Sequence, residues 1–370
     1  MKICLFFNTP SIYREAIYKM IDKEYDCDWF FGELSDDVKC LDIRCLKHST
    51  ILGIGNKGRR VYWTKGLVSL LFKKKYKTYF MYGPTWDLSF WPFLIIKALF
   101  FRKKKLNIWV HGWYGKETWL EGILKKFMFH VVDGIFCYGD YAKKMLLEMG
   151  YSKDKVFAIH NSLNYDEQLT LRKKQHDTEV YKSHFHNENP TIIFLGRLTS
   201  IKRLDMILDA VSILKQNGQL FNIVYVGDGP MRDVLEHKAK VLCLSDQVWF
   251  YGACYDEDKN AELVYNADLC VAPGNVGLTA VHTMMFGCPV ITHDNFAYQM
   301  PEFEAVKPSK TGMFFEFGNV KSLANQISNW FSQDNYQREV IRKNCYMEVD
   351  SNWNPYYQID SIKHNLKIAD

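Results

Sequence analysis

Short apolar runs and amphipathic stretches alternate along the whole chain. The runs are KICLFF, TYFMYG, LNIWVHG, GIFCYG and VFAIHN, followed later by TIIFLG, FNIVYVG, VWFYG, LCVAPG and PVITHD. They are rich in β-branched and aromatic residues, and several precede stretches with helical periodicity, such as RLDMILDAVSILKQNG. Repetition of strand, loop and helix predicts parallel sheets covered by helices, an α/β fold.

A polar segment divides this pattern. Residues 165–189 contain no strand-like run and carry many charged and amide side chains. We therefore predict two Rossmann-like domains, at residues 1–165 and 188–335, joined by a linker at residues 166–187. Residues 336–370 are expected to form a helical tail that packs back on the N-terminal domain.

The composition is that of a soluble globular protein. Apolar residues make up 48% and charged residues 24% of the 370 positions. Ten cysteines are scattered without a CxxC pair, and Cys40 and Cys45 have neither zinc-site nor redox spacing, so reduced thiols in a cytosolic protein are expected. The N-terminus MKICLFFNTPS is expected to be a buried strand and not a signal peptide. The apolar run at residues 88–101 is too short to span a bilayer.

The formal net charge is only +5, but the positive charge is unevenly placed. Residues 57–105 contain thirteen Lys and Arg against a single acid, Asp87, and are interleaved with Trp63, Trp86 and Trp91. One interpretation is a solvated basic face beside an aromatic core. The other, which we favour, is a surface that docks on anionic lipid headgroups, because cations and interfacial aromatics suit that boundary. Nucleic acid is not an expected partner, since no binding motif accompanies the charges.

The loop after TIIFLG carries candidate anion-binding chemistry. Gly196 ends the predicted strand, and Arg197 and Lys202 follow before a helix. In parallel sheets ligands bind beyond the carboxyl ends of the strands. Two cations near a helix start favour a diphosphate through their fixed charge and the helix dipole. Taken alone, however, the two cations could equally be surface charges, and the Gly-Asp-Gly-Pro turn that begins at Gly227 is of a usually structural kind.

The order of motifs in the C-terminal half resembles that of the family 4 glycosyltransferases, retaining enzymes with the GT-B fold. The matching residues are Gly196-Arg197-Leu198 with Lys202, Val226-Gly227-Asp228-Gly229-Pro230, Phe250-Tyr251-Gly252, Ala267-Asp268 with Pro273, Gly277-Leu278, Gly287-Cys288-Pro289-Val290, Pro301-Glu302 and Thr311-Gly312. The resemblance implies two Rossmann-like domains facing across a cleft. The N-terminal domain would bind the acceptor, and the C-terminal domain would bind the nucleotide sugar.

The resemblance also implies roles for individual residues. Arg197 and Lys202 would hold the donor diphosphate and offset charge on the departing nucleotide. Tyr251 and Gly252 would present backbone to the base. His111, at the end of LNIWVHG, is similar in position to a catalytically important histidine that faces the donor sugar, although a lone strand-end histidine is more often structural. The other donor-binding candidates are Gly196, Gly227, Asn275, Gly277, Leu278, His282 and Glu302.

The stretch GNVGLTAVHTMMFGCPV departs from the family pattern. The family usually carries two glutamates eight positions apart, the first at donor-sugar hydroxyls and the second at the ribose. Here these positions are Gly274 and His282. Either the site works with changed ligands, or the protein has lost transfer activity. His282 can exchange a hydrogen bond with a ribose hydroxyl, and backbone N–H groups at Gly274 with Asn275 beside them can meet the sugar. We expect activity with an altered donor preference.

Two Asp-x-Asp triplets, Asp26/Asp28 and Asp256/Asp258, match a metal-nucleotide motif of a different glycosyltransferase fold. Triplets of this kind are common by chance, and Asp256 precedes a helical stretch that it is expected to cap. We therefore expect no metal site and no cofactor.

These observations lead to the hypothesis of a retaining glycosyltransferase of the hexosyltransferase type. The donor would be a nucleotide sugar, with UDP expected because it is common among the relatives. The acceptor would be a glycan or polyprenyl-linked oligosaccharide in capsule or O-antigen biosynthesis. The expected location is cytoplasmic, peripheral on the inner face of the cell membrane. Two alternatives stay open: a non-catalytic nucleotide-sugar-binding or scaffold protein of the same fold, and a sugar-nucleotide epimerase, against which the order of Arg197 and Lys202 argues.

Overall fold

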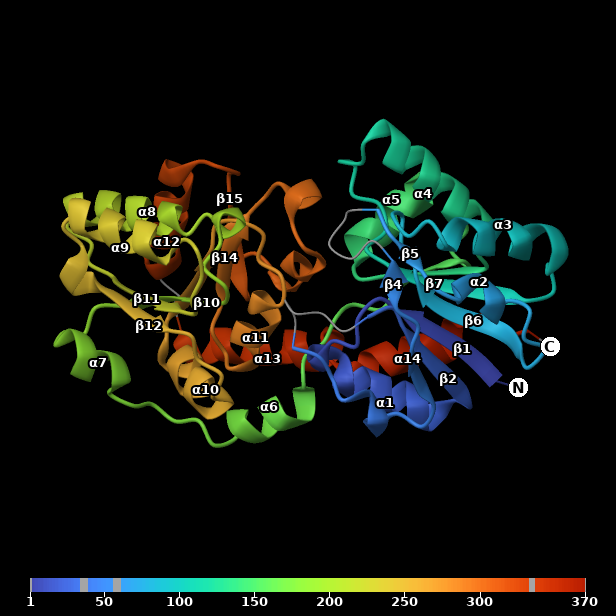
Figure 1. Cartoon of the computed structure of the whole chain (residues 1–370). Coiled ribbons are helices and arrows are strands. Elements are labelled where there is room, and N and C mark those ends of the chain that lie inside the picture. Colours follow the sequence, from blue (N-terminus) through green and yellow to red (C-terminus); the bar gives the residue numbers. More distant parts are fainter. Residues whose placement is uncertain (1, 34–38, 56–60, 333–336, 370) are drawn as a thin grey trace. The chain divides into compact units, whose positions relative to one another are not determined.

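The computed structural model describes residues 2–33, 39–55, 61–332 and 337–369. The chain forms two compact units. The N-terminal unit comprises Met1–Asn164 and Pro355–Asp370, and the C-terminal unit comprises Tyr165–Asn354. Each unit contains its own parallel sheet with helices on both faces (Figure 1).

The sheet of the N-terminal unit has seven described strands in the order β3-β2-β1-β6-β7-β8-β9, and every neighbouring pair is parallel. The strands are β1 Lys2–Phe7, β2 Cys27–Phe31, β3 Ser49–Ile51, β6 Tyr76–Tyr82, β7 Lys105–Val110, β8 Gly134–Cys137 and β9 Val156–Ala158. A small antiparallel ribbon is formed by β4 Ile54–Gly55 and β5 Trp63–Thr64.

Alternate side chains of each strand enter two separate cores. Ile3, Leu5 and Phe7 of β1 pack on the face covered by α1 and α14, whereas Cys4 and Phe6 point into the opposite core. The helices are α1 Glu15–Glu24, α2 Leu67–Leu70, α3 Phe90–Phe100, α4 Trp119–Val131, α5 Asp140–Glu148 and α14 Pro355–Asn365. Because both faces are covered, the strands are continuous apolar runs and do not alternate with polar residues.

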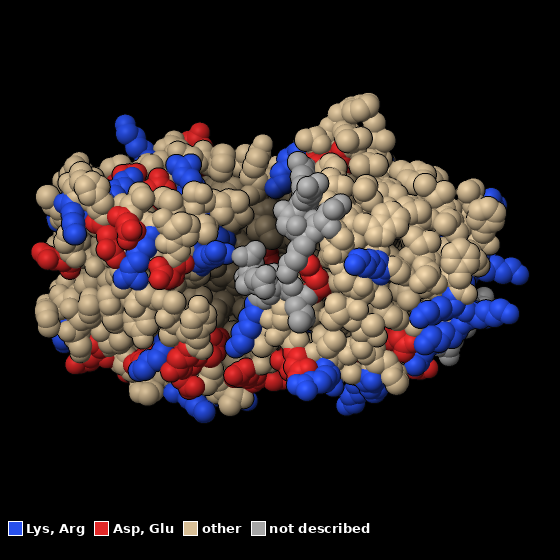
Figure 2. Space-filling view, viewed as in Figure 1, with Lys and Arg blue, Asp and Glu red and all other residues tan. Residues whose placement is uncertain are grey.

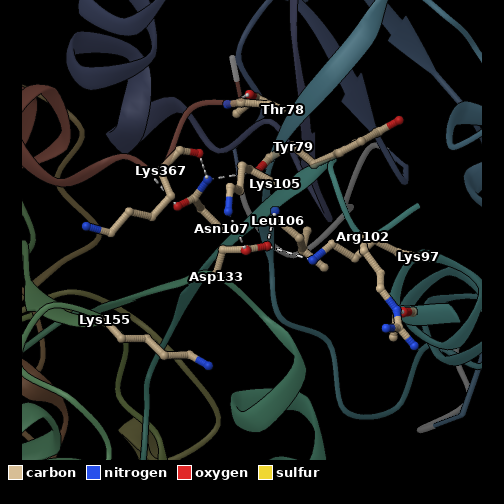
Figure 3. A network of polar contacts seen from close by, with 12 residues as sticks. Thr78, Tyr79, Lys97, Arg102, Lys105, Leu106, Asn107, Asp133, Lys155 and Lys367 are labelled. Carbon is tan, nitrogen blue, oxygen red and sulfur yellow. Dashed lines mark hydrogen bonds and ion pairs between the residues drawn. The ribbon is translucent and has the colours of Figure 1, made fainter. Parts of the chain in front are cut away.

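The end of the chain returns to the N-terminal unit and is tied to its sheet. The side chain of Asn107 on β7 accepts a hydrogen bond from the backbone N–H of Lys367 (3.0 Å) and donates one to its carbonyl (2.9 Å). Beside this pair, the buried amine of Lys97 on α3 lies 2.7 Å from the carboxylate of Asp133, as Figure 3 shows. These contacts hold both the C-terminal segment and α3 against β7.

The C-terminal unit has a parallel sheet of six described strands in the order β12-β11-β10-β13-β14-β15. They are β10 Thr191–Leu195, β11 Asn222–Val226, β12 Val248–Gly252, β13 Leu269–Ala272, β14 Val290–His293 and β15 Gly312–Phe315. One face carries α8 Asp205–Gln216, α9 Arg232–Val241 and α12 Val320–Phe331, and the other carries α10 Glu257–Asn266, α11 Thr279–Met285 and α13 Arg338–Asn352 (Figure 1).

The segment expected to be a linker contains two helices, α6 Tyr165–Arg172 and α7 Val180–Phe185. Both pack within the C-terminal unit: the buried Tyr181 hydroxyl donates to the Leu263 carbonyl (2.6 Å), and Arg172 makes two hydrogen bonds to Asp350 on α13 (3.0 and 2.9 Å). The segment expected to be a single helical tail is divided, because α13 belongs to the C-terminal unit and α14 to the N-terminal unit.

Candidate active site

Three strand-end loops of the C-terminal unit are joined by backbone hydrogen bonds. The N–H of Gly196, just after β10, donates to the Val226 carbonyl at the end of β11 (2.9 Å), and the N–H of Gly227 donates to the Gly252 carbonyl at the end of β12 (2.8 Å). All three loops lie at the carboxyl edge of the sheet, where ligands bind. Since the Gly252 carbonyl already has a donor, other backbone groups at Tyr251 and Gly252 would have to make the predicted contact with a base.

Gly227 is a glycine because two of these loops approach too closely for a side chain. Its φ is +142°, and a Cβ at this position would overlap the carbonyl of Gly196, with the carbonyl carbon only 2.9 Å away. A Cβ at Gly229 would likewise overlap the backbone of Leu198. The Gly-Asp-Gly turn therefore fixes the position of the Gly196-Arg197-Leu198 loop, which is a structural role.

Arg197 is exposed and, within the described ranges, has no hydrogen bond or ion pair to its side chain. Its backbone is nevertheless fixed, because the next residue, Leu198, is buried and donates its N–H to the Asp228 carbonyl (2.9 Å). A guanidinium on a fixed loop with its donors unused is suited to a bound anion.

Lys202 lies next to the loop that begins at Gly274. Its ammonium donates to the carbonyl of Asn275 (2.7 Å) and to Oδ1 of the same residue (2.9 Å). Burial lowers the pKa of Lys202 from its usual value, and the charge of the buried Glu302 partly offsets this effect. Lys202 is thus a partly buried cation that is hydrogen-bonded to Asn275, and the negative charge of Glu302 favours its charged form.

Gly274 cannot carry any side chain in this loop. A Cβ there would overlap the Ile201 carbonyl oxygen and lie 2.8 Å from the Lys202 carbonyl carbon. The N–H of Gly274 donates to the Lys202 carbonyl (2.9 Å), which holds the two segments together. The absence of the first family glutamate is therefore coupled to the path of the loop that carries Lys202.

A buried glutamine, Gln299, holds the part of the loop that follows Asn275. The N–H of Val276 donates to Oε1 of the buried Gln299 (3.0 Å), whose amide donates to Thr292 Oγ1 (2.7 Å). Gly277 has φ +58°, a conformation that favours glycine, and Leu278 then precedes α11. Gln299 was not among the residues selected from sequence, because a lone glutamine carries no motif.

His282 on α11 is paired with a carboxylate that the sequence analysis did not select. Its Nε2 lies 2.7 Å from Oε1 of Glu257 at the start of α10. The same carboxylate accepts from Gln168 Nε2 (2.8 Å) and Asn260 Nδ2 (3.3 Å). Burial opposes ionisation of Glu257, but the contacts with His282 and the amides outweigh it and lower the pKa to about 2. A negative charge is therefore present beside His282.

His111 follows β7 in the N-terminal unit, and its ring centre lies 4.9 Å from that of Tyr138. Desolvation by the surrounding protein is the largest cause that lowers the pKa of His111 to about 4, and the charges of Arg14, Lys125 and Lys116 act in the same direction. The ring retains exposed surface, yet the direction of the shift holds because the cations alone would produce it. His111 is accordingly neutral near pH 7.

The Asp-x-Asp carboxylates have structural partners. Asp256 caps α10 by accepting from the N–H groups of Asp258 (3.0 Å) and Lys259 (3.3 Å), as expected from the sequence. Asp28 is held by Lys2 (2.8 Å) and Lys75 (2.5 Å) at the opposite, amino end of the first sheet.

Comparison with known proteins supports a common origin for the C-terminal unit. Residues 176–346 match the family described as Glycosyl transferases group 1. The chain is 27% identical over 264 residues to the "Uncharacterized 41.2 kDa protein in cps region" of Klebsiella pneumoniae, covering 69% of this chain and 61% of that protein. It is 35% identical over 112 residues to a GDP-mannose-dependent alpha-(1-6)-phosphatidylinositol dimannoside mannosyltransferase of Mycobacterium tuberculosis, covering 29% of this chain and 28% of that protein. The matches therefore span less than two thirds of either relative.

The whole chain is similar in structure to Anabaena Alr3699/HepE in complex with UDP. The TM-score is 0.71 at 16% identity, with 99% of each chain covered. At this identity the likeness establishes the fold. Residues 176–346 thus match a glycosyltransferase group 1 domain, in a chain whose two Rossmann-like halves have the α/β fold of the GT-B glycosyltransferases.

Proposed function

We propose that this chain is a glycosyltransferase of the hexosyltransferase type that moves a sugar from a nucleotide-sugar donor to a glycan or lipid-linked oligosaccharide. The observation that carries the proposal is the combination of an exposed Arg197 with Lys202, held 2.7 Å from the Asn275 carbonyl, within the matched domain. Cations fixed in advance stabilise the negative charge that develops on a departing nucleoside diphosphate. The reaction as proposed needs no metal ion, because Arg197 and Lys202 supply this charge.

The remaining site residues have complementary roles in this proposal. The carboxylate of Glu257 lies 2.7 Å from Nε2 of His282 without hydrogen-bond geometry, so it acts on the ring through its charge, and we assign the other ring nitrogen to a ribose hydroxyl. The loop at Gly274 contributes backbone to the donor sugar, and the neutral His111 exchanges a hydrogen bond with the sugar or the acceptor. We include retention of the anomeric configuration in the proposal on the strength of the motif order alone.

The proposed donor is a UDP-sugar, and the proposed pathway is cell-surface polysaccharide biosynthesis. HepE, the structural neighbour, was captured with UDP, and the Klebsiella relative is named for a cps region. The mycobacterial relative is named for GDP-mannose, so a test must compare nucleotide bases directly.

We also propose that the N-terminal unit docks peripherally on an anionic membrane, at the cytoplasmic face. Trp119 (81% exposed), Ile123 and Phe127 recur at helical spacing along α4, and Leu99 and Phe100 (75% exposed) project from α3. Figure 2 shows few charged side chains over these helices and a concentration of Lys and Arg at the outer edge of the unit. No helix in the described ranges is long and apolar enough to cross a bilayer. Apolar side chains bordered by cations suit the lipid interface.

Only part of the basic run at residues 57–105 belongs to this surface. Lys97 and Lys105 both contact Asp133 (2.7 and 3.3 Å), and the Lys104 ammonium donates to the Leu71 carbonyl (2.7 Å). Only the buried Lys97 lies on α3, and its contact with Asp133 does not fit a solvated basic face. Lys105 belongs to β7, and Lys104 holds the segment that follows α2. Residues 57, 59 and 60 lie outside the described residues.

An open pocket of about 590 Å³ beside α3 is lined by Phe72, Lys74, Lys77, Leu99, Phe100, Phe101, Arg102, Lys103 and Lys104.

The membrane proposal is tested by co-sedimentation with phosphatidylglycerol vesicles. Binding should weaken as salt rises, and a Trp119→Ser, Phe100→Ser double variant should bind less than wild type at every salt concentration. Absence of binding at low salt would rule the surface out.

The catalytic proposal is tested with a panel of UDP-, GDP- and dTDP-sugars, by measuring nucleotide release together with nucleotide binding. We expect release from at least one donor. Arg197→Ala should remove most turnover without lowering the unfolding temperature, whereas Lys215→Ala, which removes another exposed cation of the same unit, should change neither. Tight nucleotide binding without release across the panel would instead support the scaffold alternative, which the missing carboxylate at Gly274 favours.

A further inference from the structure

The loops at the carboxyl edge of the N-terminal sheet bring one cation, Arg14, close to His111 and Tyr138. Arg14 ends a short 3-10 turn (Ile12–Arg14) that follows β1, His111 follows β7, and Tyr138 follows β8. These strands are close neighbours in the order β1-β6-β7-β8, so their loops meet at one edge. Arg14 donates a hydrogen bond to the Tyr138 hydroxyl, and the Tyr138 ring lies 4.9 Å from that of His111.

Aromatic rings hold the guanidinium of Arg14. Its central carbon lies 5.3 Å from the ring centre of Tyr13, 5.5 Å from that of Trp109 and 5.6 Å from that of Tyr138. Its other described hydrogen bond is a long one, to the Tyr18 hydroxyl (3.4 Å). Across the described ranges no carboxylate pairs with Arg14, and its buried Nε has no acceptor.

A partly buried guanidinium is normally balanced by an acid, because an uncompensated charge in protein surroundings is unfavourable. Arginine has five N–H donors, and only two hydrogen bonds of Arg14 are described. The surrounding charges do not compensate for it: Lys125 is also positive and is itself balanced by Glu117 (2.9 Å). The rings and phenol oxygens orient the guanidinium, but among the residues that the structure describes none neutralises its charge or accepts from its Nε, which leaves both available to a bound anion.

We propose that Arg14 is the centre of a phosphate-binding site in the N-terminal unit, with His111 at its rim, and that its ligand is the phosphate or diphosphate group of the acceptor. This deepens the proposed function and rests on it, since Arg197 and Lys202 are already assigned to the donor diphosphate. A planar guanidinium binds two phosphate oxygens through parallel N–H bonds, which a lysine cannot reproduce. A neutral His111 can donate one further hydrogen bond to such an anion.

Two kinds of acceptor carry this chemistry: a prenyl diphosphate-linked oligosaccharide and a soluble sugar phosphate. Farnesyl diphosphate and glucose 1-phosphate are probes for the two. Each would be titrated calorimetrically into the full chain saturated with UDP, so that a donor diphosphate site is already filled. Tighter binding of farnesyl diphosphate would identify the lipid-linked source, and tighter binding of glucose 1-phosphate the soluble one.

Arg14→Gln should weaken binding of the preferred probe by about tenfold or more, as expected for loss of charge-assisted hydrogen bonds. Arg14→Lys keeps the positive charge but loses the two parallel N–H donors of the guanidinium. Its affinity for the probe should therefore lie between those of wild type and Arg14→Gln. Lys153→Gln, which removes an exposed charge elsewhere in the same unit, should bind the probe as wild type does. Melting temperatures of all variants would establish that they fold, and Arg14→Lys, the conservative change, keeps the test decisive should Arg14→Gln unfold.

The proposal is overturned if neither probe binds the UDP-saturated protein, or if Arg14→Gln binds the probe as well as wild type does. UDP affinity is measured for each variant as well. It should be unchanged in Arg14→Gln, and a loss would assign Arg14 to the donor and contradict an acceptor site. If wild type fails to bind UDP, the proposed donor fails. The probe titrations without UDP then still decide whether Arg14 binds phosphate.

Discussion

Gly274 and His282, the two positions at which the motif resemblance leads us to expect glutamates, differ in what surrounds them. At Gly274 the backbone of Ile201 and Lys202 occupies the space that a side chain would need. At His282 there is room for a side chain, and a carboxylate from another helix, Glu257, lies 2.7 Å away. Close backbone packing thus excludes any side chain at the first position, whereas at the second a carboxylate is supplied by α10.

This comparison shows why two substitutions in one stretch need not have the same consequence. The close approach at Gly274 positions Lys202, whose ammonium contacts Asn275. The pair at His282 retains a negative charge, because the pKa of Glu257 is lowered to about 2. Under the proposed function, such a site would have a cation at Lys202 and a carboxylate at Glu257, and backbone in place of a carboxylate at Gly274 would meet the donor sugar.

The largest expected effect comes from restoring the first glutamate. Gly274→Glu should not raise turnover above that of the wild type and should destabilise the C-terminal unit by more than about 3 kcal/mol, because backbone cannot move aside as a side chain can. Gly277→Ala is the matched control: it adds a Cβ at φ +58°, where the nearest atoms are 3.9 Å away, and should cost only about 1–2 kcal/mol. Chemical denaturation of both variants measures the difference. Equal stabilities would contradict the packing explanation.

Lys202→Met should reduce donor turnover by about 100-fold, the usual effect of removing one fixed group that stabilises developing charge. The apolar stem is kept, so the unfolding temperature should change little. Lys215→Met, which alters an exposed lysine on α8, should leave turnover unchanged. Initial rates of nucleotide release test this, and a rate within threefold of wild type for Lys202→Met would remove the lysine from the reaction.

His282→Glu should raise the donor KM by about tenfold instead of improving binding, because the new carboxylate would face the ionised Glu257. Adding Glu257→Gln to the same chain should recover most of the loss, since it removes the repulsion. Glu262→Gln on the same helix should give no recovery. Independent, additive effects in this double-mutant cycle would show that the two positions are not coupled.

The smallest expected effect is on acid stability. Glu257 has a pKa lowered below its unfolded value, so its contribution is fully present above about pH 4.5 and is lost as the pH falls towards about 2. Because Glu257 is partly exposed and solvent screens its charge, we expect it to contribute roughly 1–2 kcal/mol to the free energy of unfolding over this range. Glu257→Gln should be less stable than wild type at pH 6 and should lose less stability on acidification. Parallel curves for the two proteins would contradict the assignment.

Much of the fold was predictable from the pattern of apolar residues. All ten apolar runs form strands, because both faces of each sheet are covered and these strands are therefore mostly apolar. Two strands of the first sheet were missed, the edge strand β3 and its neighbour β2. In β2, Asp28 interrupts the apolar run, and only the structure shows that Lys2 and Lys75 neutralise it. β3 is three residues long, which is too short to show the alternation of apolar and polar residues that marks a strand.

The site was predictable where a motif is local and unpredictable where packing assembles it. Arg197 and Lys202 follow a strand within a few residues, so their loop could be recognised. Glu257 is distant from His282 in sequence and occupies the first turn of a helix, where an acid is common for reasons of the helix dipole. Arg14 is a lone cation in a 3-10 turn, and only the absence of an acid among the rings around it distinguishes it.

Nucleotide release from a panel of UDP-, GDP- and dTDP-sugars, measured with wild type and Lys202→Met in parallel with calorimetric nucleotide binding, tests the proposed function most directly. We expect wild type to bind one nucleotide and to release it from the corresponding sugar donor, and Lys202→Met to lose about 100-fold of that rate. Nucleotide binding by wild type with no release from any donor would contradict the proposed transferase.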